Sequence, residues 1–189
     1  MNKPSLSESP LHIVTLHKTK SNILVELKAK VQNLQVIRNK LTAVGAKHVG
    51  VFHQIDIYFH VPKGRLKLRE IEGSEKPQLI YYERMNAAGP RKSVVFIIEI
   101  QDPKRFETLL HKILKIRATV EKTREIYRYK GTQIHLDVVQ QLGTFIEFER
   151  SVSSTAQAIE RGRRVLKRLM ETFEIRLENL ENWSYGDLV

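Results

Sequence analysis

Phe145-Ile146-Glu147-Phe148-Glu149-Arg150 alternates apolar and charged residues over most of its length. Because successive side chains of a β-strand point to opposite faces, Glu147 and Glu149 share one face of the strand that this stretch predicts. A sheet with many charges on one face either meets water there or holds a charged ligand. The stretch therefore predicts a β-rich fold with one charged face, and that face is a candidate site.

The same alternation recurs along the chain and gives the predicted strands a common design. Within 23–31, the residues Glu26, Lys28 and Lys30 oppose Val25, Leu27, Ala29 and Val31; within 54–61, Gln54, Asp56, Tyr58 and His60 oppose Ile55, Ile57, Phe59 and Val61; Arg65, Lys67 and Arg69 oppose Leu66 and Leu68; Lys122 and Arg124 share a face; and Asp137 lies opposite Leu136 and Val138. This repetition favours a single sheet with its charges gathered on one side.

Hairpin-like links and a few helices complete the predicted architecture. Pro62-Lys63-Gly64 and 129–132 read as turns, and 85–93 reads as a loop over a binding mouth. Helices are expected from Asn33 to Gly45, from Asp102-Pro103 onward, and from Ser153 or Ser154 onward. About eight strands and three helices favour an α+β fold, an antiparallel eight-stranded barrel with a charged interior and helices packed outside.

Length and charge limit the classes of function. The 189 residues suit one domain, which we place at 21–189, with 1–20 as a flexible tail or an edge extension. There is no cysteine, so disulfides and thiolate metal sites are excluded. The formal net charge of +11 implies a polyanionic partner. No apolar run approaches the ~20 residues needed to cross a bilayer, and no signal peptide is evident, so we expect a cytoplasmic protein without a membrane partner.

Seven ordered blocks of the sequence resemble a known family, the CYTH superfamily of triphosphate tunnel enzymes, with the class IV adenylyl cyclase branch as the most similar. The blocks are 25–30 (VELKAK), 54–59 (QIDIYF), 64–69 (GRLKLR), 79–84 (LIYYER) with Gly89-Pro90, 120–124 (VEKTR), 135–137 (HLD) and 143–149 (GTFIEFE). The resemblance implies a barrel whose charged interior binds a triphosphate, and it suggests a homodimer. One position departs from the family's Glu-x-Glu-x-Lys signature, because Leu24 stands where the first glutamate would be.

A triphosphate tunnel needs cations for the phosphates and oxygen ligands for a metal. Triphosphate carries up to about four negative charges, and its transfer reactions depend on positioning and on neutralising charge. The candidate phosphate-binding residues are Lys28, Lys30, Arg65, Lys67, Arg69, Arg84, Lys122 and Arg124. The candidate ligands of Mg²⁺ or Mn²⁺ are Glu26, Glu147 and Glu149, with Asp137 as a further one. We expect His135 to form hydrogen bonds or to lie at the surface, and leave it out of the metal set.

Three functions from different classes fit the sequence. The first is a metal-dependent enzyme acting on an organic or nucleoside triphosphate, either a class IV-type adenylyl cyclase that converts ATP to cyclic AMP and pyrophosphate, or a triphosphatase acting on thiamine triphosphate or tripolyphosphate. The second is a nucleic-acid-binding barrel, which we disfavour because carboxylates share the charged faces. The third is a polyphosphate- or nucleotide-binding protein without turnover, which Leu24 favours. The sequence identifies no catalytic general base.

Overall fold

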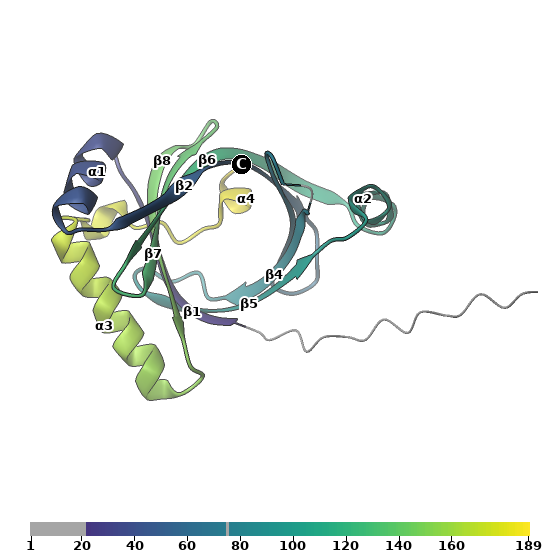
Figure 1. Cartoon of the computed structure of the whole chain (residues 1–189). Helices are drawn as coiled ribbons and strands as arrows, with labels where there is room; N and C mark the ends of the chain where they lie inside the picture. The colour runs from purple at the N-terminus through teal and green to yellow at the C-terminus, as the bar shows by residue number, and fades with distance from the viewer. Residues whose placement is uncertain (1–21, 75) are drawn as a thin grey trace, which may run out of the picture.

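The computed structural model describes residues 22–74 and 76–189, and its centre is a closed eight-stranded antiparallel β-barrel (Figure 1). Around the barrel the strands follow the order β1-β5-β4-β3-β2-β6-β7-β8, and β8 pairs with β1 to close it. Closure leaves none of the described strands with a free edge and encloses one face of each. The predicted α+β barrel is therefore confirmed. The proposed tail at 1–20 lies outside the described residues.

Eight strands form the barrel, and helices follow β1, β5 and β8. In chain order the elements are β1 (Asn22–Lys30), α1 (Leu34–Ala43), β2 (Lys47–Phe59), β3 (Arg65–Ile71), β4 (Gln78–Arg84), β5 (Arg91–Glu99), α2 (Pro103–Ile113), β6 (Ile116–Tyr129), β7 (Thr132–Val139), β8 (Gly143–Val152), α3 (Ala156–Thr172), a short 3₁₀ helix (Leu177–Asn179) and α4 (Tyr185–Leu188). No helix among them is both long and apolar enough to cross a membrane.

The outer apolar face of the barrel packs against α1 and α3. Val25, Leu27 and Ala29 of β1 are almost fully buried there, beside residues of β7, β8 and both helices. Gly162 lets α3 lie close to the sheet, since a Cβ at this position would come within 2.9 Å of Val25 Cγ2. Burying one such aliphatic side chain contributes about 1.5–3 kcal/mol, so this face is the main source of cohesion between barrel and helices.

Local sequence signals set the helix ends largely as expected. The Asn33 side chain accepts hydrogen bonds from the first turn of α1, and Gly45 follows its end with a positive φ of 73°. Asp102 caps α2 with Pro103 in its first turn. The predicted start of α3 at Ser153 or Ser154 was early, because Thr155 provides the cap by accepting a hydrogen bond from the Ala158 N–H.

The interior of the barrel has three zones, only one of which is the charged interior that the alternation predicts. At the end where β1 finishes, α4 lies inside the barrel (Figure 1) and packs with an inward-facing apolar cluster of Tyr58, Ala118, Val120, Val139, Phe145 and Tyr185. Charged residues occupy the middle. At the opposite end Leu24 packs with Ile80, Tyr82 and Val95. The strand period fixes which residues face inward, but inward-facing positions include apolar ones at both ends.

Candidate active site

A cavity of about 440 Å³ occupies the barrel interior and is the candidate site. Residues from all eight strands and from the start of α4 line it. Its charged lining residues are Glu26, Lys28, Lys67, Arg69, Arg84, Arg124, His135, Glu147 and Glu149. Its apolar lining includes Leu24, Phe52, Ile71, Ile80, Val95, Ile97 and Ile126.

Glu147 and Glu149 project from β8 toward His135 of β7. One ligand atom from each of the three residues lies within 4.8 Å of the other two. Across the other edge of β8, Glu26 is the register partner of Glu149, and Lys28 is the partner of Glu147. The structure thus brings three of the four predicted metal-binding carboxylates to one cavity and places His135, which is outside the predicted metal set, beside two of them.

Glu147 is held in its ionised form by two cations. Arg124 donates a hydrogen bond to it at 2.6 Å, and Lys28 Nζ lies 3.6 Å from its other oxygen. Burial alone would raise the pKa of Glu147, but Arg124 and its other positive neighbours hold that pKa well below the usual range. An ionised carboxylate is the form that a metal ion requires.

Glu26 behaves differently from Glu147, although it pairs with Arg84 at 2.9 Å and Arg91 at 3.4 Å. Burial raises the pKa of Glu26 to about 7, and the negative charges of Glu149 and Glu147 act in the same direction, whereas Arg84 opposes them. A cation beside this group would favour its ionised form.

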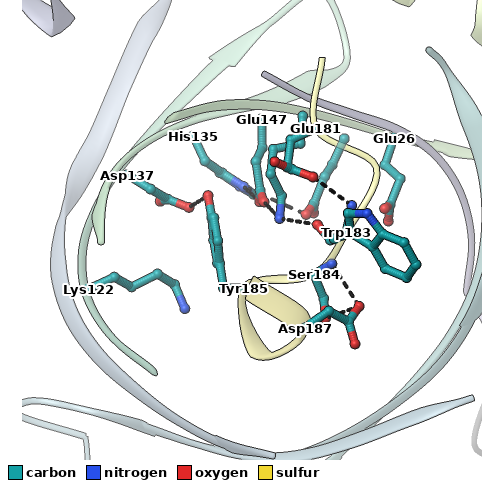
Figure 2. A network of polar contacts seen from close by, with 12 residues as sticks. Glu26, Lys122, His135, Asp137, Glu147, Glu181, Trp183, Ser184, Tyr185 and Asp187 are labelled. Carbon is teal, nitrogen blue, oxygen red and sulfur yellow. Dashed lines mark hydrogen bonds and ion pairs between the residues drawn. The ribbon is translucent and has the colours of Figure 1, made fainter. Parts of the chain in front are cut away.

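Asp137, the fourth predicted metal ligand, has other partners in the structure. It is completely buried, accepts two hydrogen bonds from Arg124 at 2.7 and 2.6 Å, and accepts one from the Tyr185 hydroxyl at 2.8 Å (Figure 2). It does not line the cavity or join the group of His135, Glu147 and Glu149. Its contacts position Arg124 and α4.

The predicted phosphate-binding residues fall into two sets. Lys28, Lys67, Arg69, Arg84 and Arg124 line the cavity, whereas Lys30, Arg65 and Lys122 do not. Lys30 is exposed at the end of β1, Arg65 binds Asp187 at 2.7 Å, and Lys122 is buried against Asp56 at 2.6 Å. By strand alternation all three belong to the same face of their strands as the cavity residues, but they lie at a different depth along the barrel.

Asp56 is the central counter-ion of the basic wall, and the sequence reading gave it no role. It is fully buried and binds Lys67 at 2.9 Å, Arg69 at 2.6 Å and Lys122 at 2.6 Å. Although burial opposes ionisation, Arg69 and the two lysines hold its pKa well below the ordinary value. Its inward parity in 54–60 was visible in the sequence; its three partners depend on the pairing of β2 with β3 and β6.

Two arginines of the cavity region have buried N–H groups without an acceptor. Among the described residues, Arg84 Nε and Arg91 Nη2 have no hydrogen-bond partner. The side chains are only 3% and 4% exposed. Buried donors are normally paired, so these groups indicate an anion-binding position beside Glu26. The sequence reading placed Arg91 in a loop, but it is the first residue of β5.

The C-terminal segment also enters the site, which no sequence pattern indicated. Figure 2 shows α4 inside the barrel, with Tyr185 reaching toward Asp137. The close fit requires Gly186, because a Cβ there would lie 2.6 Å from the Tyr58 ring. Lys28 donates to the Trp183 carbonyl oxygen at 2.9 Å, and Asp187 binds Arg65 and Arg117. These contacts close one end of the tunnel.

The donor set fits a divalent cation. Glu26, Glu147 and Glu149 supply oxygen ligands of the kind that Mg²⁺ and Mn²⁺ prefer. The Nδ1 atom of His135 is buried beside the two β8 carboxylates and has no hydrogen-bond partner among the described residues. A buried imidazole nitrogen next to two carboxylates is a donor set that fits a divalent cation.

Comparisons with known proteins agree with this geometry. The CYTH domain model matches residues 22–178. A Methanocaldococcus jannaschii protein, provisionally named an adenylate cyclase, is 26% identical over 178 residues, which cover 88% of this chain and 98% of that protein. A Pyrococcus horikoshii structure has a TM-score of 0.79 and 26% identity, covering 88% of this chain and 99% of that one.

A more distant structure from Hippeastrum shares the fold with a TM-score of 0.62 and 16% identity, over 88% of this chain and 94% of that one. It is provisionally named an adenylyl cyclase and is described as having a dominant triphosphatase activity. The family resemblance noted in the sequence is confirmed by the domain match, which spans most of the chain. The protein belongs to the CYTH domain family.

Proposed function

We propose that this protein is a metal-dependent enzyme acting on an organic triphosphate, with ATP as the first candidate substrate and cyclic AMP with pyrophosphate as the products. The alternative reaction is hydrolysis of a triphosphate such as thiamine triphosphate. The observation that carries the proposal is the pair of buried arginines with unpartnered N–H groups, Arg84 and Arg91, beside a cavity that also holds carboxylates. Such donors suit phosphate oxygens.

The basic lining supports a bound triphosphate chain. Lys28, Lys67, Arg69, Arg84 and Arg124 approach the cavity from β1, β3, β4 and β6, so the cations surround the space instead of forming a surface patch. A phosphate chain held from several sides is fixed in orientation, and orientation is most of what phosphoryl transfer requires. Enclosed cations also fit a small anion better than a nucleic-acid duplex.

A metal held by Glu26, Glu147 and Glu149 would neutralise charge that develops on the phosphate oxygens. The chain's own residues then bind and orient the substrate. In the cyclase reaction the ribose 3′ oxygen bonds to the α-phosphorus while the bond to pyrophosphate breaks, and the hydroxyl proton leaves to a base. In the hydrolase reaction a water oxygen bonds to the γ-phosphorus while its bond to the bridging β–γ oxygen breaks, so that orthophosphate and a diphosphate form and the water proton leaves to a base. Both reactions use the same cation-lined cavity.

The apolar end of the cavity supports an organic substrate in preference to tripolyphosphate. Since α4 closes the other end, a triphosphate bound at the charged middle zone would direct its organic group toward Leu24, Ile80 and Val95. Inorganic tripolyphosphate would leave this wall without a partner. An aromatic base would bury apolar area against it.

The test is incubation of purified protein with ATP, thiamine triphosphate or tripolyphosphate, each with Mg²⁺ or Mn²⁺, followed by separation of the products. Cyclic AMP with pyrophosphate supports the cyclase. Orthophosphate release supports the triphosphatase, which the Hippeastrum protein shows to be compatible with this fold. No product from any of the substrates, together with no thermal stabilisation by them, would overturn the proposal. The expected homodimer stays a prediction for size-exclusion chromatography with light scattering.

Phosphate binding should weaken at alkaline pH because of Lys67. Burial lowers the pKa of Lys67 to about 8, and Arg69 beside it acts in the same direction. Lys67 is therefore mostly charged below that pH and mostly neutral above it. From about pH 7 to pH 9 we expect the tripolyphosphate affinity of the wild type to fall about tenfold more than that of Lys67→Arg. The guanidinium of this variant does not titrate in this range. Calorimetric titration of both proteins measures the difference; parallel pH profiles would contradict it.

The apolar end should discriminate between substrates through Leu24. Leu24→Asn keeps a similar size but replaces the methyl groups that meet Ile80, Tyr82 and Val95. We expect ATP to bind roughly tenfold more weakly, with tripolyphosphate affinity unchanged. Val51→Asn, at an exposed position of β2, is the matched control. An equal loss for both ligands would show that the wall does not contact the organic group.

A further inference from the structure

His135 is a buried histidine whose Nδ1 atom faces two carboxylates at ion-pair distance without forming a hydrogen bond. Its side chain is 4% exposed, and Nδ1 has no hydrogen-bond partner among the described residues. The same atom lies 3.7 Å from Glu147 Oε2 and 3.7 Å from Glu149 Oε1, which is beyond hydrogen-bond distance. Leaving a polar atom unpaired in the interior is costly, so its position calls for a partner.

The strand pairing fixes this arrangement. His135 and Glu147 are register partners between β7 and β8, and Gln133 is the partner of Glu149. The Gln133 side-chain oxygen lies 3.4 Å from His135 Nε2 and can accept a proton from it, and in the neutral ring with this tautomer the lone pair is on Nδ1. Ligands mounted on neighbouring strands are held more rigidly than ligands on loops.

We propose that His135 Nδ1 is a metal ligand together with Glu147 and Glu149, and that it supplies the donor that Leu24 does not. Two bonds of about 2.1 Å can span each 3.7 Å separation from Nδ1 to a carboxylate oxygen, so the three donors can share one ion with little movement. Leu24 on β1 and His135 on β7 both line this cavity. This inference rests on the metal dependence of the proposed function and not on which reaction follows.

The histidine changes which metal suits the site. A set made only of carboxylates suits Mg²⁺ and Mn²⁺, whereas an imidazole ligand suits Zn²⁺, Co²⁺ and related ions. Nitrogen ligation should therefore raise affinity for transition metals over Mg²⁺. We expect the wild-type protein to prefer Mn²⁺ and Co²⁺ to Mg²⁺, and the preference should depend on His135.

The test is Mn²⁺ binding followed by pulsed electron paramagnetic resonance, which detects hyperfine coupling from a directly bound nitrogen. Wild type should show imidazole nitrogen coupling, and His135→Gln should lose it while its affinity for Co²⁺ falls roughly tenfold or more and its affinity for Mg²⁺ changes little. His53→Gln on β2 is the control, since His53 pairs with Glu121 at a partly exposed position. Thermal melting of each variant verifies folding.

The wild-type spectrum alone can overturn the inference. Bound Mn²⁺ without nitrogen coupling, or no Mn²⁺ binding at all, would remove His135 from the ligand set even if His135→Gln failed to fold. Equal losses of Co²⁺ and Mg²⁺ affinity in a folded His135→Gln would do the same. Nitrogen coupling without turnover of any triphosphate would support the metal site and contradict the proposed reaction. Turnover with Mg²⁺ but no nitrogen coupling would support the proposed reaction and contradict His135 as a metal ligand.

Discussion

Glu149→Gln is expected to lower turnover by at least about a hundredfold while leaving the fold intact. The amide keeps the shape of the side chain but removes the charge that would hold a metal. Glu149 is 29% exposed at its side chain and has fewer cation contacts than Glu147, so its loss should cost little stability. Turnover, Mn²⁺ affinity and the thermal midpoint should be measured on the same preparation.

Glu147→Gln provides an informative companion to this experiment. Its turnover should fall as far, but its stability should fall too, because Arg124 and Lys28 would each lose a partner. Glu121→Gln is the matched control, since this glutamate pairs with His53 and does not line the cavity. Wild-type turnover in Glu149→Gln would contradict the assignment of this residue to a metal.

Asp56→Asn is expected to destabilise the protein by about 3–5 kcal/mol, the usual cost of leaving buried charges without their partner. Lys67, Arg69 and Lys122 all bind this carboxylate, and Lys122 has no exposed side-chain surface. Urea unfolding measures the change, with Glu72→Gln as an exposed control. A cost below about 1 kcal/mol would show that the three cations find other compensation.

The pH dependence of this contribution follows from the sign of the pKa shift. The folded-state pKa of Asp56 lies well below its ordinary value, so its stabilisation is complete above about pH 4 and is lost only as pH falls further. Wild type and Asp56→Asn should therefore differ fully at neutral pH and converge in strong acid. Tripolyphosphate should stabilise Asp56→Asn more than wild type, because the added anion replaces part of the missing charge.

Strand alternation predicted the fold because the face to which a strand residue points depends only on its position relative to its neighbours in sequence. It assigned Glu26, Lys28, Glu147 and Glu149 to the inner face, and the structure places all four in the cavity. Helix caps at Asn33 and Asp102 were equally local and were confirmed.

Strand alternation does not give depth along the barrel, which explains why some of the candidate residues lie away from the cavity. Lys28 and Lys30 share a face, yet only Lys28 reaches the cavity. Lys122 and Asp56 were both assigned inward, but their mutual contact depends on which strands become neighbours around the barrel. The four-residue α4 is too short for any periodic signal, so its entry into the tunnel was unpredictable.

The junction of β1 with β8 joins the first described strand to the last. Glu26 and Glu149, about 120 positions apart in sequence, become register partners there, as do Lys28 and Glu147. Contacts between such distant segments form late and slowly, because a long loop must be ordered before they contribute any stability. The carboxylates of the candidate site therefore come together only when the barrel closes.

A ligand that contacts both β1 and β8 would stabilise the pairing of these two strands. By binding only the closed barrel, it raises the free energy needed to separate the two strands. The two strands pair from Ile23 opposite Val152 to Lys30 opposite Phe145. Amide hydrogen exchange in this paired segment should slow when triphosphate and metal are present. Binding at the site and closure of the barrel are therefore thermodynamically linked, and the ligand-free barrel, although closed, should open more often between β1 and β8 than the ligand-bound one.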